Sequence, residues 1–299
     1  MIVRHGAQLG TASSARPIQV VLFDAFDTLV SPRIAPHLQY AEEAVKAGLQ
    51  VDEQRMASAF KQAFKTLSAE HPLYGKHTSL SGPRAWWSLL IKQTMLTSGL
   101  DPSSVNRVLP RLTTNILDRF SSREAYRLSG TSDAEVLETL KSLRAISVQS
   151  SLATNSDSAI LLACRDLGLS AYINLNTDVG EDERAAATLS YDIGYEKPDA
   201  RFFKEAVRRA WSTHRRDSSS SSSLTEEEKA AATLYVGDDF AQDIVGATQA
   251  GLQAAWINRG NKTVDTASQR SLPSFYQVDS LLDIVDVVRG SRHTSQQIE

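Results

Sequence analysis

Short apolar runs alternate with helical segments along much of this chain, and this alternation restricts its fold more than any other feature. Helical segments are expected at residues 133–144, 157–167, 200–215 and 243–250. Four β-branched or apolar runs qualify as strands, and a fifth is weaker: residues 18–23, 146–153, 232–236 and 252–257, with 171–175 as the weaker one. Strands that alternate with helices form a parallel sheet covered on both faces. We therefore expect an α/β fold with a doubly wound parallel sheet.

The stretch between the first two predicted strands is far longer than a crossover needs. Apolar residues recur in it at helical spacing: Met56, Phe60, Ala63, Phe64, Leu67, then Trp86, Leu89 and Leu90. Such spacing is typical of amphipathic helices with one buried face. We expect residues 33–130 to form an inserted helical cap domain. Because the insertion leaves the chain just after the first strand, it should overhang the carboxyl ends of the strands, where such folds bind ligands.

The rest of the chain divides around this insertion. Residues 18–32 and 131–290 are expected to form the α/β core, with flexible ends at residues 1–17 and 291–299. A serine-rich tract at 216–224 has the composition of a solvated linker within the core. Thr225 and Glu228 follow it with the spacing of a capping box, which predicts a helix start there. Residues 181–189 receive no functional interpretation.

Composition narrows the classes of partner. The chain has 299 residues, of which 41% are hydrophobic and 22% charged, and its net charge is -3, which is typical of a soluble globular protein. The charge provides no basic field for nucleic acid, and no run is long and apolar enough for a membrane span. The single cysteine, Cys164, excludes an internal disulfide framework and is expected in the core. The expected partner is a small molecule, and the oligomeric state stays open.

The N-terminus allows two cellular locations. Residues 1–23 contain Arg4, Arg16 and several Ser and Ala residues but no acid, which is the composition of a mitochondrial presequence. The segment is short, and Gly6 and Gly10 interrupt it. We predict a cytoplasmic or nuclear protein, with import into the mitochondrial matrix as the alternative.

Polar residues follow the predicted strands where each strand ends. In V-V-L-F-D-A-F-D-T-L-V, residues 20–30, the apolar run stops at Asp24 and Asp27 follows. T-N-S at 154–156 follows the second strand, G-Y-E-K-P-D at 194–199 precedes the helix at 200, and G-D-D-F-A-Q-D at 237–243 follows the strand at 232–236. Considered alone, an aspartate after a strand is typical of a turn or a helix cap, and Lys197-Pro198 is typical of a helix start. Neighbouring parallel strands bring all these ends to one crevice. Five of these aspartates cannot all lie close together in the ionised state without a cation: Asp24, Asp27, Asp238, Asp239 and Asp243.

In this order, the motifs F-D-A-F-D-T-L, L-A-T-N-S, G-Y-E-K-P-D and Y-V-G-D-D-F-A-Q-D resemble those of the haloacid dehalogenase-like hydrolase superfamily. The resemblance covers most of the chain and includes a helical cap inserted after the first motif. The F-D-x-x-D-T-L form and the paired Trp86-Trp87 are most similar to the group of haloacid dehalogenase-like hydrolase domain-containing protein 3. The resemblance implies a Rossmann-like core. It also implies hydrolysis of a small phosphorylated metabolite, which is the usual reaction of the superfamily.

The resemblance also implies roles for individual residues. Asp24 matches the nucleophile that forms an aspartyl intermediate, and Thr28 matches the threonine that braces its loop. Thr154 and Asn155 match the position whose hydroxyl and adjacent amide hold a phosphoryl oxygen. Lys197 matches the lysine that neutralises charge on the nucleophile and the phosphate.

A Mg²⁺ cofactor is implied by the same motifs. Asp24 and Asp238 match ligands of the ion, and the main-chain carbonyl of Phe26 would supply another oxygen. Asp239 and Asp243 both stand where a second acid of the fourth motif is expected, and the sequence leaves the choice between them open.

Phe26 departs from the pattern of the phosphatases. They place a second aspartate at this position, which protonates the leaving group and then activates water. Asp27 comes one residue later and should point elsewhere, so we do not assign it this role. General acid-base assistance contributes roughly 10²- to 10⁴-fold to a rate, so hydrolysis of alkyl phosphates should be slow and acyl or aryl phosphates should react better.

Two alternatives follow from Phe26. Dehalogenases of the superfamily carry an aromatic residue here, in D-A-Y-G-T-L, and the release of halide needs neither a proton nor a metal; however, they lack an acid-rich G-D-D. The other alternative is a catalytically feeble or noncatalytic protein that retains metabolite binding. The sequence favours a Mg²⁺-dependent phosphatase-like hydrolase over both. Trp86 and Trp87 are interpreted as packing residues.

Overall fold

The computed structural model describes residues 4–5, 16–176, 187–214, 224–260, 262–264, 272 and 275–296. Most of the predicted N-terminal segment 1–17, residues 177–186, residues 216–223 of the predicted serine-rich linker and the last three residues lie outside this part of the chain. By its internal contacts the chain divides into two compact units. The first comprises Met1–Ser31, Leu128–Asn155 and Gly168–Glu299, and the second comprises Pro32–Arg127 and Ser156–Leu167.

The first unit is built on a twisted, mainly parallel sheet. Its strands are β1 (Arg4–His5), β2 (Val20–Phe23), β5 (Gln149–Thr154), β6 (Thr188–Leu189), β7 (Thr233–Gly237), β8 (Gln253–Ile257) and β9 (Tyr276–Val278). They follow the order β1-β9-β8-β7-β2-β5-β6, and in it β1 alone is antiparallel to its neighbour. β3 (Val30–Pro32) and β4 (Tyr126–Leu128) form a separate two-stranded sheet.

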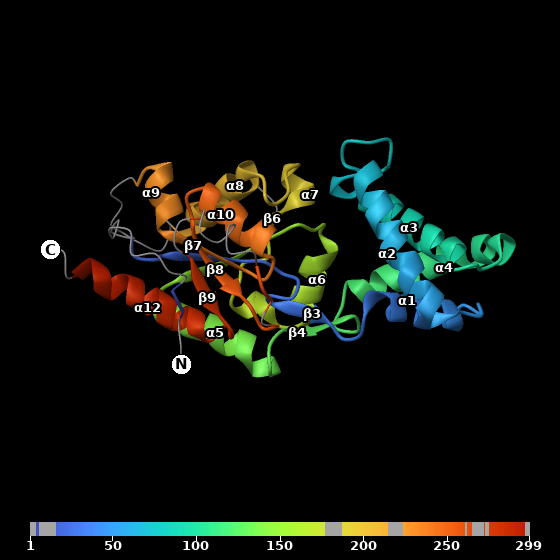
Figure 1. The fold of residues 1–299 in the computed structure, drawn as a ribbon, viewed down its shortest axis with the longest axis horizontal. Coiled ribbons are helices and arrows are strands. Elements are labelled where there is room, and N and C mark those ends of the chain that lie inside the picture. The colour runs from blue at the N-terminus through green and yellow to red at the C-terminus, as the bar shows by residue number, and fades with distance from the viewer. Residues whose placement is uncertain are drawn as a thin grey trace. The chain divides into compact units, whose positions relative to one another are not determined.

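Helices cover the sheet on both faces (Figure 1). One face carries α8 (Ala200–His214), α9 (Glu226–Ala231) and α10 (Gly246–Gln249), and the other carries α5 (Asp133–Ala145) and α12 (Asp283–Gln296). Because β2 lies between β5 and β7 under helices on both sides, all four of its residues are buried, which explains its continuous apolar sequence. The predicted doubly wound α/β fold is confirmed.

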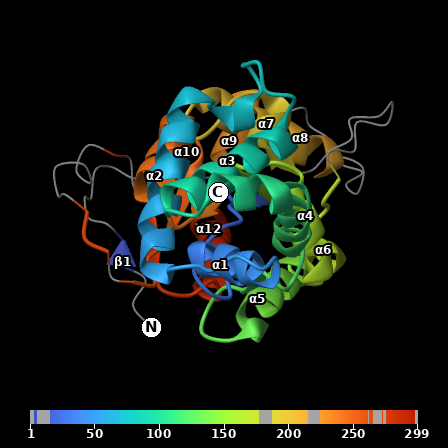
Figure 2. The same ribbon diagram turned by 90° about the vertical axis from the view of Figure 1, so that its right-hand side faces the viewer.

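The second unit is helical. It contains α1 (Pro36–Lys46), α2 (Glu53–Glu70), the 3₁₀ turn η1 (Leu73–Gly75), α3 (Pro83–Thr97), α4 (Pro102–Phe120) and α6 (Ala159–Asp166). Each of α1 to α4 packs against two others around a common centre, as Figure 2 shows. The predicted apolar stripe of α2 faces that centre through Met56, Ala63 and Leu67, whereas Phe64 is exposed. The described part of the chain contains no helix that is long and apolar enough to cross a membrane.

Aromatic side chains form part of the core of this unit. Trp86 is buried, donates to the carbonyl oxygen of His71 at 3.0 Å and packs edge-on against Phe64 and Tyr74. Trp87 is partly buried and donates through Nε1 to Asp157 Oδ2 at 2.6 Å. These contacts of Trp86 and Trp87 within the helical unit agree with the interpretation of the pair as packing residues.

Some local predictions are confirmed. Cys164 is buried. Thr225 and Glu228 make both hydrogen bonds of a capping box at the start of α9. The predicted helix at 243–250 begins earlier than expected, as a π-helix η3 (Phe240–Val245) that continues into α10, because the Asp239 carboxylate caps it by accepting from Ala241 and Gln242.

One prediction about an element is wrong. Residues 171–175 form no strand: the first of them ends the 3₁₀ turn η2 (Leu169–Ala171), and Asn174 forms an isolated bridge to β5. Ile173 and Leu175 are buried in the core, so their apolar character reflects packing, and the edge strand is β6. Residues 291–296 of the segment predicted as flexible form the last part of α12, where the buried Ser291 hydroxyl accepts a hydrogen bond from the Ile18 amide at 3.1 Å. The flexibility of the C-terminus stays a prediction.

Candidate functional site

The order of the strands places the candidate site at the centre of the sheet. From β2 the chain continues to β5 and β6 on one side, then returns to β7, β8 and β9 on the other. In open parallel sheets, ligands bind outside the carboxyl ends of the strands where the direction of winding reverses. That point lies between β2 and β7, and Asp24 and Asp238 directly follow these two strands.

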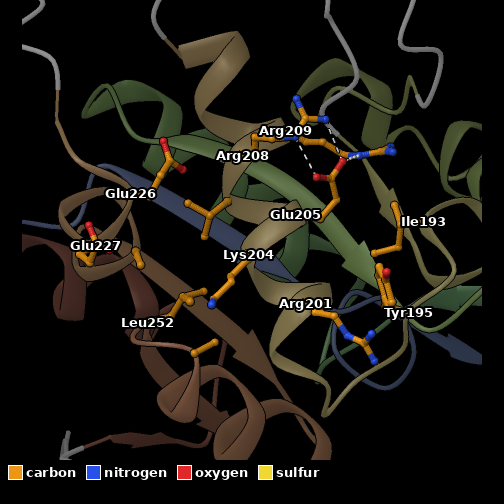
Figure 3. A pocket seen from close by; sticks show the side chains of 13 residues that line it. Ile193, Tyr195, Arg201, Lys204, Glu205, Arg208, Arg209, Glu226, Glu227 and Leu252 are labelled. Carbon is orange, nitrogen blue, oxygen red and sulfur yellow. Dashed lines mark hydrogen bonds and ion pairs between the residues drawn. The ribbon is translucent and has the colours of Figure 1, made fainter.

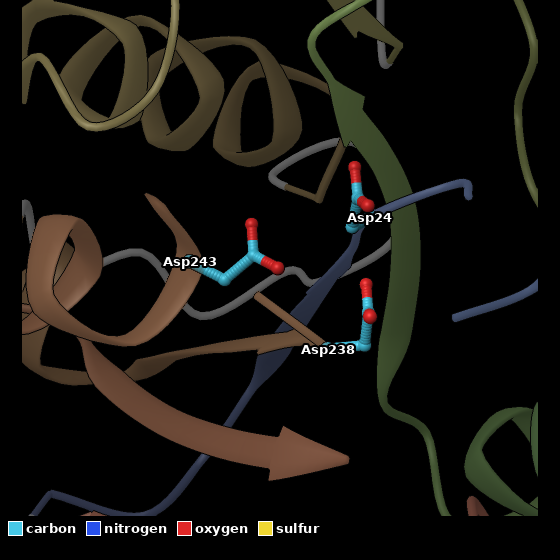
Figure 4. Close-up of side chains that lie close together, drawn as sticks. All are labelled: Asp24, Asp238 and Asp243. Carbon is cyan, nitrogen blue, oxygen red and sulfur yellow. The ribbon is translucent and has the colours of Figure 1, made fainter. Parts of the chain in front are cut away.

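Three aspartates converge there (Figure 4). One carboxylate oxygen from each of Asp24, Asp238 and Asp243 lies within 4.8 Å of the others. Asp24 and Asp243 are buried, and Asp238 is partly exposed. Burial raises the pKa of Asp238, and it raises the pKa of Asp243 to about 7 in spite of a nearby lysine. The cluster is therefore electrostatically unfavourable with all three acids ionised.

The lysine is Lys197, which lies between two of these acids. Its Nζ donates to Asp24 Oδ1 and to Asp243 Oδ1, each at 2.7 Å, and the side chain is almost completely buried. Burial alone would lower the pKa of Lys197, but Asp24 and Asp243 raise it well above its usual value. The ammonium group therefore stays charged and is hydrogen-bonded to both carboxylates.

Gly237 allows Asp243 to reach the cluster. A Cβ atom at this position would lie only 2.1 Å from Asp243 Oδ2. The same oxygen accepts from the Asp239 amide at 2.9 Å, so the Asp243 carboxylate lies directly over the backbone at the end of β7. A glycine is needed here for close approach, not for an unusual backbone conformation.

Asp239 lies outside the cluster. Its side chain is exposed, and its Oδ1 accepts from the amides of Ala241 and Gln242 at 2.9 Å as the cap of η3. The sequence leaves Asp239 and Asp243 as competing ligands, and the structure brings Asp243 to Asp24 and Asp238.

Two predicted site residues have buried hydroxyls that find no protein partner among the described residues, Thr28 and Thr154. A buried hydroxyl without a hydrogen bond is costly, and such a group at a site favours a role in holding a ligand. Asn155 is engaged with the protein: its side chain accepts from the Lys197 amide at 2.8 Å and donates to the Lys197 carbonyl oxygen at 3.2 Å. This pair of bonds fixes the backbone that carries Lys197.

The loop after Asp24 contains the residue that departs from the phosphatase pattern. Phe26 is partly exposed and forms a single bridge with Val30. Asp27 is exposed and has φ of 52°, in the left-handed region, while its amide donates to the Val30 carbonyl oxygen at 2.7 Å. The cluster of three acids excludes Asp27, as expected from its place in the sequence.

The sequence interpretation missed a group of residues after β8. Arg259 donates to the carbonyl oxygens of Asp27 at 2.6 Å and Thr28 at 3.2 Å, and its other neighbour is the Glu135 carboxylate at 3.7 Å. Lys262 donates to Asp238 Oδ2 at 2.9 Å. The run N-R-G-N-K at 258–262 directly follows a predicted strand, so the rule that drew attention to the other strand ends applies to it as well.

The acid cluster has the donors that a magnesium ion prefers. Mg²⁺ binds oxygen ligands, usually one or two carboxylates together with water and substrate phosphate oxygens. The close approach of three carboxylate oxygens, one of them on the partly exposed Asp238, fits such an ion and would relieve the repulsion among the acids. The residues present therefore fit a divalent cation.

The first unit also contains a cavity that none of the three clustered aspartates lines (Figure 3). It has a volume of about 710 Å³ and lies over α8 and α9. Its arginines already have partners: Arg208 and Arg209 both pair with Glu205, and Arg201 pairs with Asp199. These guanidinium groups are paired within the protein, and none of the predicted site residues lines this cavity.

Known proteins resemble this chain in sequence. A family model described as HAD-hydrolase-like matches residues 194–284, which include Lys197 and all three aspartates of the fourth motif. Haloacid dehalogenase-like hydrolase domain-containing protein 3 of Danio rerio is 27% identical over 270 residues, and the match covers 89% of this chain and 97% of the relative.

Solved structures share the fold. A 2-haloacid dehalogenase from Pseudomonas syringae superposes with a TM-score of 0.55 at 24% identity and covers 91% of this chain and 98% of its own. A putative HAD-hydrolase from Bacillus subtilis, YfnB, bound to magnesium, superposes with a TM-score of 0.59 at 16% identity and covers 91% of this chain and 99% of its own. At these identities the likeness shows the fold alone.

Proposed function

Because the chain belongs to the haloacid dehalogenase-like hydrolase superfamily, we propose that it hydrolyses a small phosphorylated metabolite with Asp24 as the nucleophile. The observation that carries this proposal is the contact between Asp24 and Lys197 beside the carboxylates of Asp238 and Asp243. A buried carboxylate paired with a lysine, next to oxygen ligands for Mg²⁺, is suited to attack on an electrophilic phosphorus.

The reaction divides into two displacements. In the first, an Asp24 carboxylate oxygen forms a bond to phosphorus while the bond from phosphorus to the leaving oxygen breaks. In the second, water attacks the same phosphorus, phosphate leaves, and the Asp24 carboxylate is restored. Lys197 balances negative charge at Asp24 in both steps, and the unpartnered Thr154 hydroxyl is suited to donate to a phosphoryl oxygen.

A Mg²⁺ ion would be held by Asp24, Asp238 and Asp243, with the Phe26 main-chain carbonyl as a further oxygen donor. When bound, it supplies Lewis-acid neutralisation of the phosphoryl charge. Thr28 follows the nucleophile loop, and its burial agrees with a bracing role for that loop.

Phe26 defines the substrate class. With a phenyl group in the place of a general acid, the leaving oxygen departs without a proton from the protein, so substrates with stable leaving groups are favoured. Acyl and aryl phosphates meet this condition, and alkyl phosphates do not. We expect a difference of roughly 10²- to 10⁴-fold between these classes, as the usual contribution of general acid catalysis indicates.

A second candidate function is metabolite binding without turnover, and Phe26 is the specific observation in its favour. The remaining site residues would still bind a metal and a phosphate. Carbon-halogen hydrolysis is a weaker candidate, because a metal-free site with three clustered carboxylates would repel the carboxylate of a haloacid.

The test is phosphate release from acetyl phosphate and p-nitrophenyl phosphate, with and without Mg²⁺. Metal-dependent release that is lost in Asp24→Asn and raised in Phe26→Asp is expected. Asp286→Asn, which removes an exposed acid of α12 that pairs with Arg289, serves as the control. Native rates in Asp24→Asn would exclude the proposed nucleophile, and Mg²⁺ binding without any release would favour the binding protein. Halide release from a 2-haloacid without metal would favour the dehalogenase.

A further inference from the structure

Lys262 is a second lysine at the acid cluster, and the loop that carries it is held in place. Asn258 is almost completely buried and lies at the end of β8. Its Oδ1 accepts from the Lys262 amide at 2.7 Å, and its Nδ2 donates to the Lys262 carbonyl oxygen at 3.0 Å. Both backbone groups of Lys262 are therefore bound by one buried side chain.

The same arrangement occurs at Lys197. Asn155, at the end of β5, binds the amide and the carbonyl oxygen of Lys197 at 2.8 Å and 3.2 Å. In each case an asparagine that follows a parallel strand fixes the backbone of a lysine whose ammonium group contacts an acid of the cluster. The repetition indicates that Lys262 is positioned by the fold and is not an incidental surface charge.

The contact of Lys262 falls on a carboxylate of the candidate metal site. Its Nζ donates to Asp238 Oδ2 at 2.9 Å and lies 3.5 Å from the Asp238 carbonyl oxygen. Asp238 is the acid of the cluster that is most open to solvent, and a cavity of about 420 Å³ that both residues line lies beside it. A divalent cation and an ammonium group that both bind the Asp238 carboxylate repel each other, so the binding of one weakens the binding of the other.

We propose that Lys262 is a counter-cation built into the site: it neutralises Asp238 when no metal is bound, and it competes with a divalent cation for this carboxylate. The inference rests on the proposed function for the identity of the cation. Lys262 thereby lowers the affinity of the site for Mg²⁺. Its side chain also lines the adjacent cavity, where the ammonium group can contact an anionic group of the substrate.

The test is Mg²⁺ binding by isothermal titration calorimetry in the absence of substrate. Lys262→Met is expected to bind Mg²⁺ about three- to tenfold more tightly than the native protein, as the loss of a partly exposed ion-pair competitor implies. Lys262→Arg keeps the charge and is expected to stay within about twofold. Lys204→Met, which removes an exposed lysine of α8, is the matched control and should leave the affinity unchanged.

Asn258→Ala separates position from charge. It keeps the ammonium group but removes the two bonds that hold its backbone, so tighter Mg²⁺ binding than in the native protein is expected, by a smaller factor than in Lys262→Met. A thermal melt of each variant checks that it is folded. An unchanged affinity in Asn258→Ala together with a raised affinity in Lys262→Met would reduce Lys262 to a general charge effect and would overturn the positioned role.

Other outcomes bear on the inference directly. Unchanged or weaker Mg²⁺ binding in Lys262→Met contradicts it, as does a lack of Mg²⁺ binding in both the native protein and this variant. Binding by the variant alone supports it. Failure of the proposed function has a different signature, because competition between Lys262 and Mg²⁺ without phosphate release would leave the inference standing and remove only the phosphatase activity.

Discussion

The backbone of Asp27 adopts a conformation that costs energy for a residue with a side chain. Its φ of 52° places it in the left-handed region, where glycine is favoured and aspartate is tolerated. The strained residue lies three positions after Asp24, and its carbonyl oxygen is held by Arg259. Strain at such a position persists because the surrounding hydrogen bonds determine the conformation of the nucleophile loop.

Paired substitutions at Asp27 measure this strain. Asp27→Gly and Asp27→Ala both remove the carboxylate, but only alanine retains a Cβ atom in the left-handed region. We expect Asp27→Gly to be about 1 kcal/mol more stable than Asp27→Ala in urea denaturation. At Lys61, on an exposed position of α2, the same pair should show the reverse order, because alanine is the better helix former. The same order at both positions would contradict a left-handed Asp27.

Gly237 offers a second prediction at the residue scale. In Gly237→Ala the new methyl group would overlap with the Asp243 carboxylate, which must then leave its place beside Lys197. We expect a loss of about 1–3 kcal/mol in the free energy of unfolding, as for other overpacked sites, and Mg²⁺ binding weakened by at least about tenfold in calorimetry. Gly290→Ala, on the exposed face of α12 where a Cβ meets nothing within 4 Å, should be neutral or stabilising. Native Mg²⁺ affinity in Gly237→Ala would show that Asp243 is not a ligand.

At the scale of elements, one hydrogen-bonded assembly connects the loop after β2 with three other elements. Arg259 comes from the end of β8 and binds two carbonyl oxygens of the nucleophile loop. Glu135 of α5 faces Arg259 and also accepts from the amides of Thr131 and Leu281 at 3.0 Å and 2.9 Å. Burial opposes ionisation of Glu135, yet these amides lower its pKa, so the carboxylate remains charged beside Arg259. The assembly fixes the loop that presents Asp24.

Arg259→Lys tests this positioning role. A lysine keeps the charge but cannot bind two carbonyl oxygens and a carboxylate with the planar geometry of a guanidinium group. We expect kcat to fall by roughly ten- to a hundredfold, in line with small misplacements of catalytic groups, while KM and Mg²⁺ affinity change little. Arg292→Lys, which loses a hydrogen bond to the Ile146 carbonyl oxygen away from the site, should leave kcat and KM unchanged. If Arg259→Lys is less stable and its activity falls only in proportion to the fraction of folded protein, kcat per folded molecule is unchanged. That result would assign Arg259 a structural role only.

The sequence predicts the elements whose character is set locally, and it fails where distant contacts decide. β2 is predictable because burial on both faces requires a continuous apolar run. The cap of α9 is predictable because Thr225 and Glu228 bond to each other's backbone. In contrast, Ile173 and Leu175 are apolar for the sake of the core without belonging to a strand, and the two-residue β6 owes its strand conformation to pairing with β5.

Within the site the same division applies. Asp24 and Asp238 could be predicted because they directly follow parallel strands, whose ends come together whatever the side chains in between. Lys197 lies in the loop between α7 and α8, and its place in the site could be predicted from its motif. The choice of Asp243 over Asp239 could not, since it depends on the helix that begins at Phe240 and turns Asp243 back over Gly237. Lys262 and Arg259 follow a predicted strand, so the same rule could have drawn attention to them. Their partners lie more than 20 residues away in sequence, and the arrangement of β2, β7 and β8 identifies these contacts.

At the scale of the whole molecule, the proposed metal site would couple metal binding to the stability of the sheet. The three acids of the cluster come from the ends of β2 and β7 and from η3. Their mutual repulsion therefore destabilises the folded arrangement of these three elements. A cation that binds only the folded chain stabilises it by about 1.4 kcal/mol for each tenfold excess of its concentration over Kd. Mg²⁺ should therefore raise the melting temperature of the native protein.

Adjacent acids of the fourth motif provide the test. Asp238→Asn removes a member of the cluster and should abolish most of the Mg²⁺-induced rise in melting temperature, with little change in the metal-free protein. Asp239→Asn should keep the rise, because Asp239 lies outside the cluster, but it weakens the cap of η3 and lowers the metal-free stability by up to about 1 kcal/mol. The two substitutions carry the same change of charge at neighbouring positions, so a general charge effect would give the same response in both. Equal loss of the Mg²⁺ response in both variants would contradict the assignment of Asp238, and not Asp239, as a metal ligand. Loss of the response in Asp238→Asn alone, with a lower metal-free stability in Asp239→Asn, would support it.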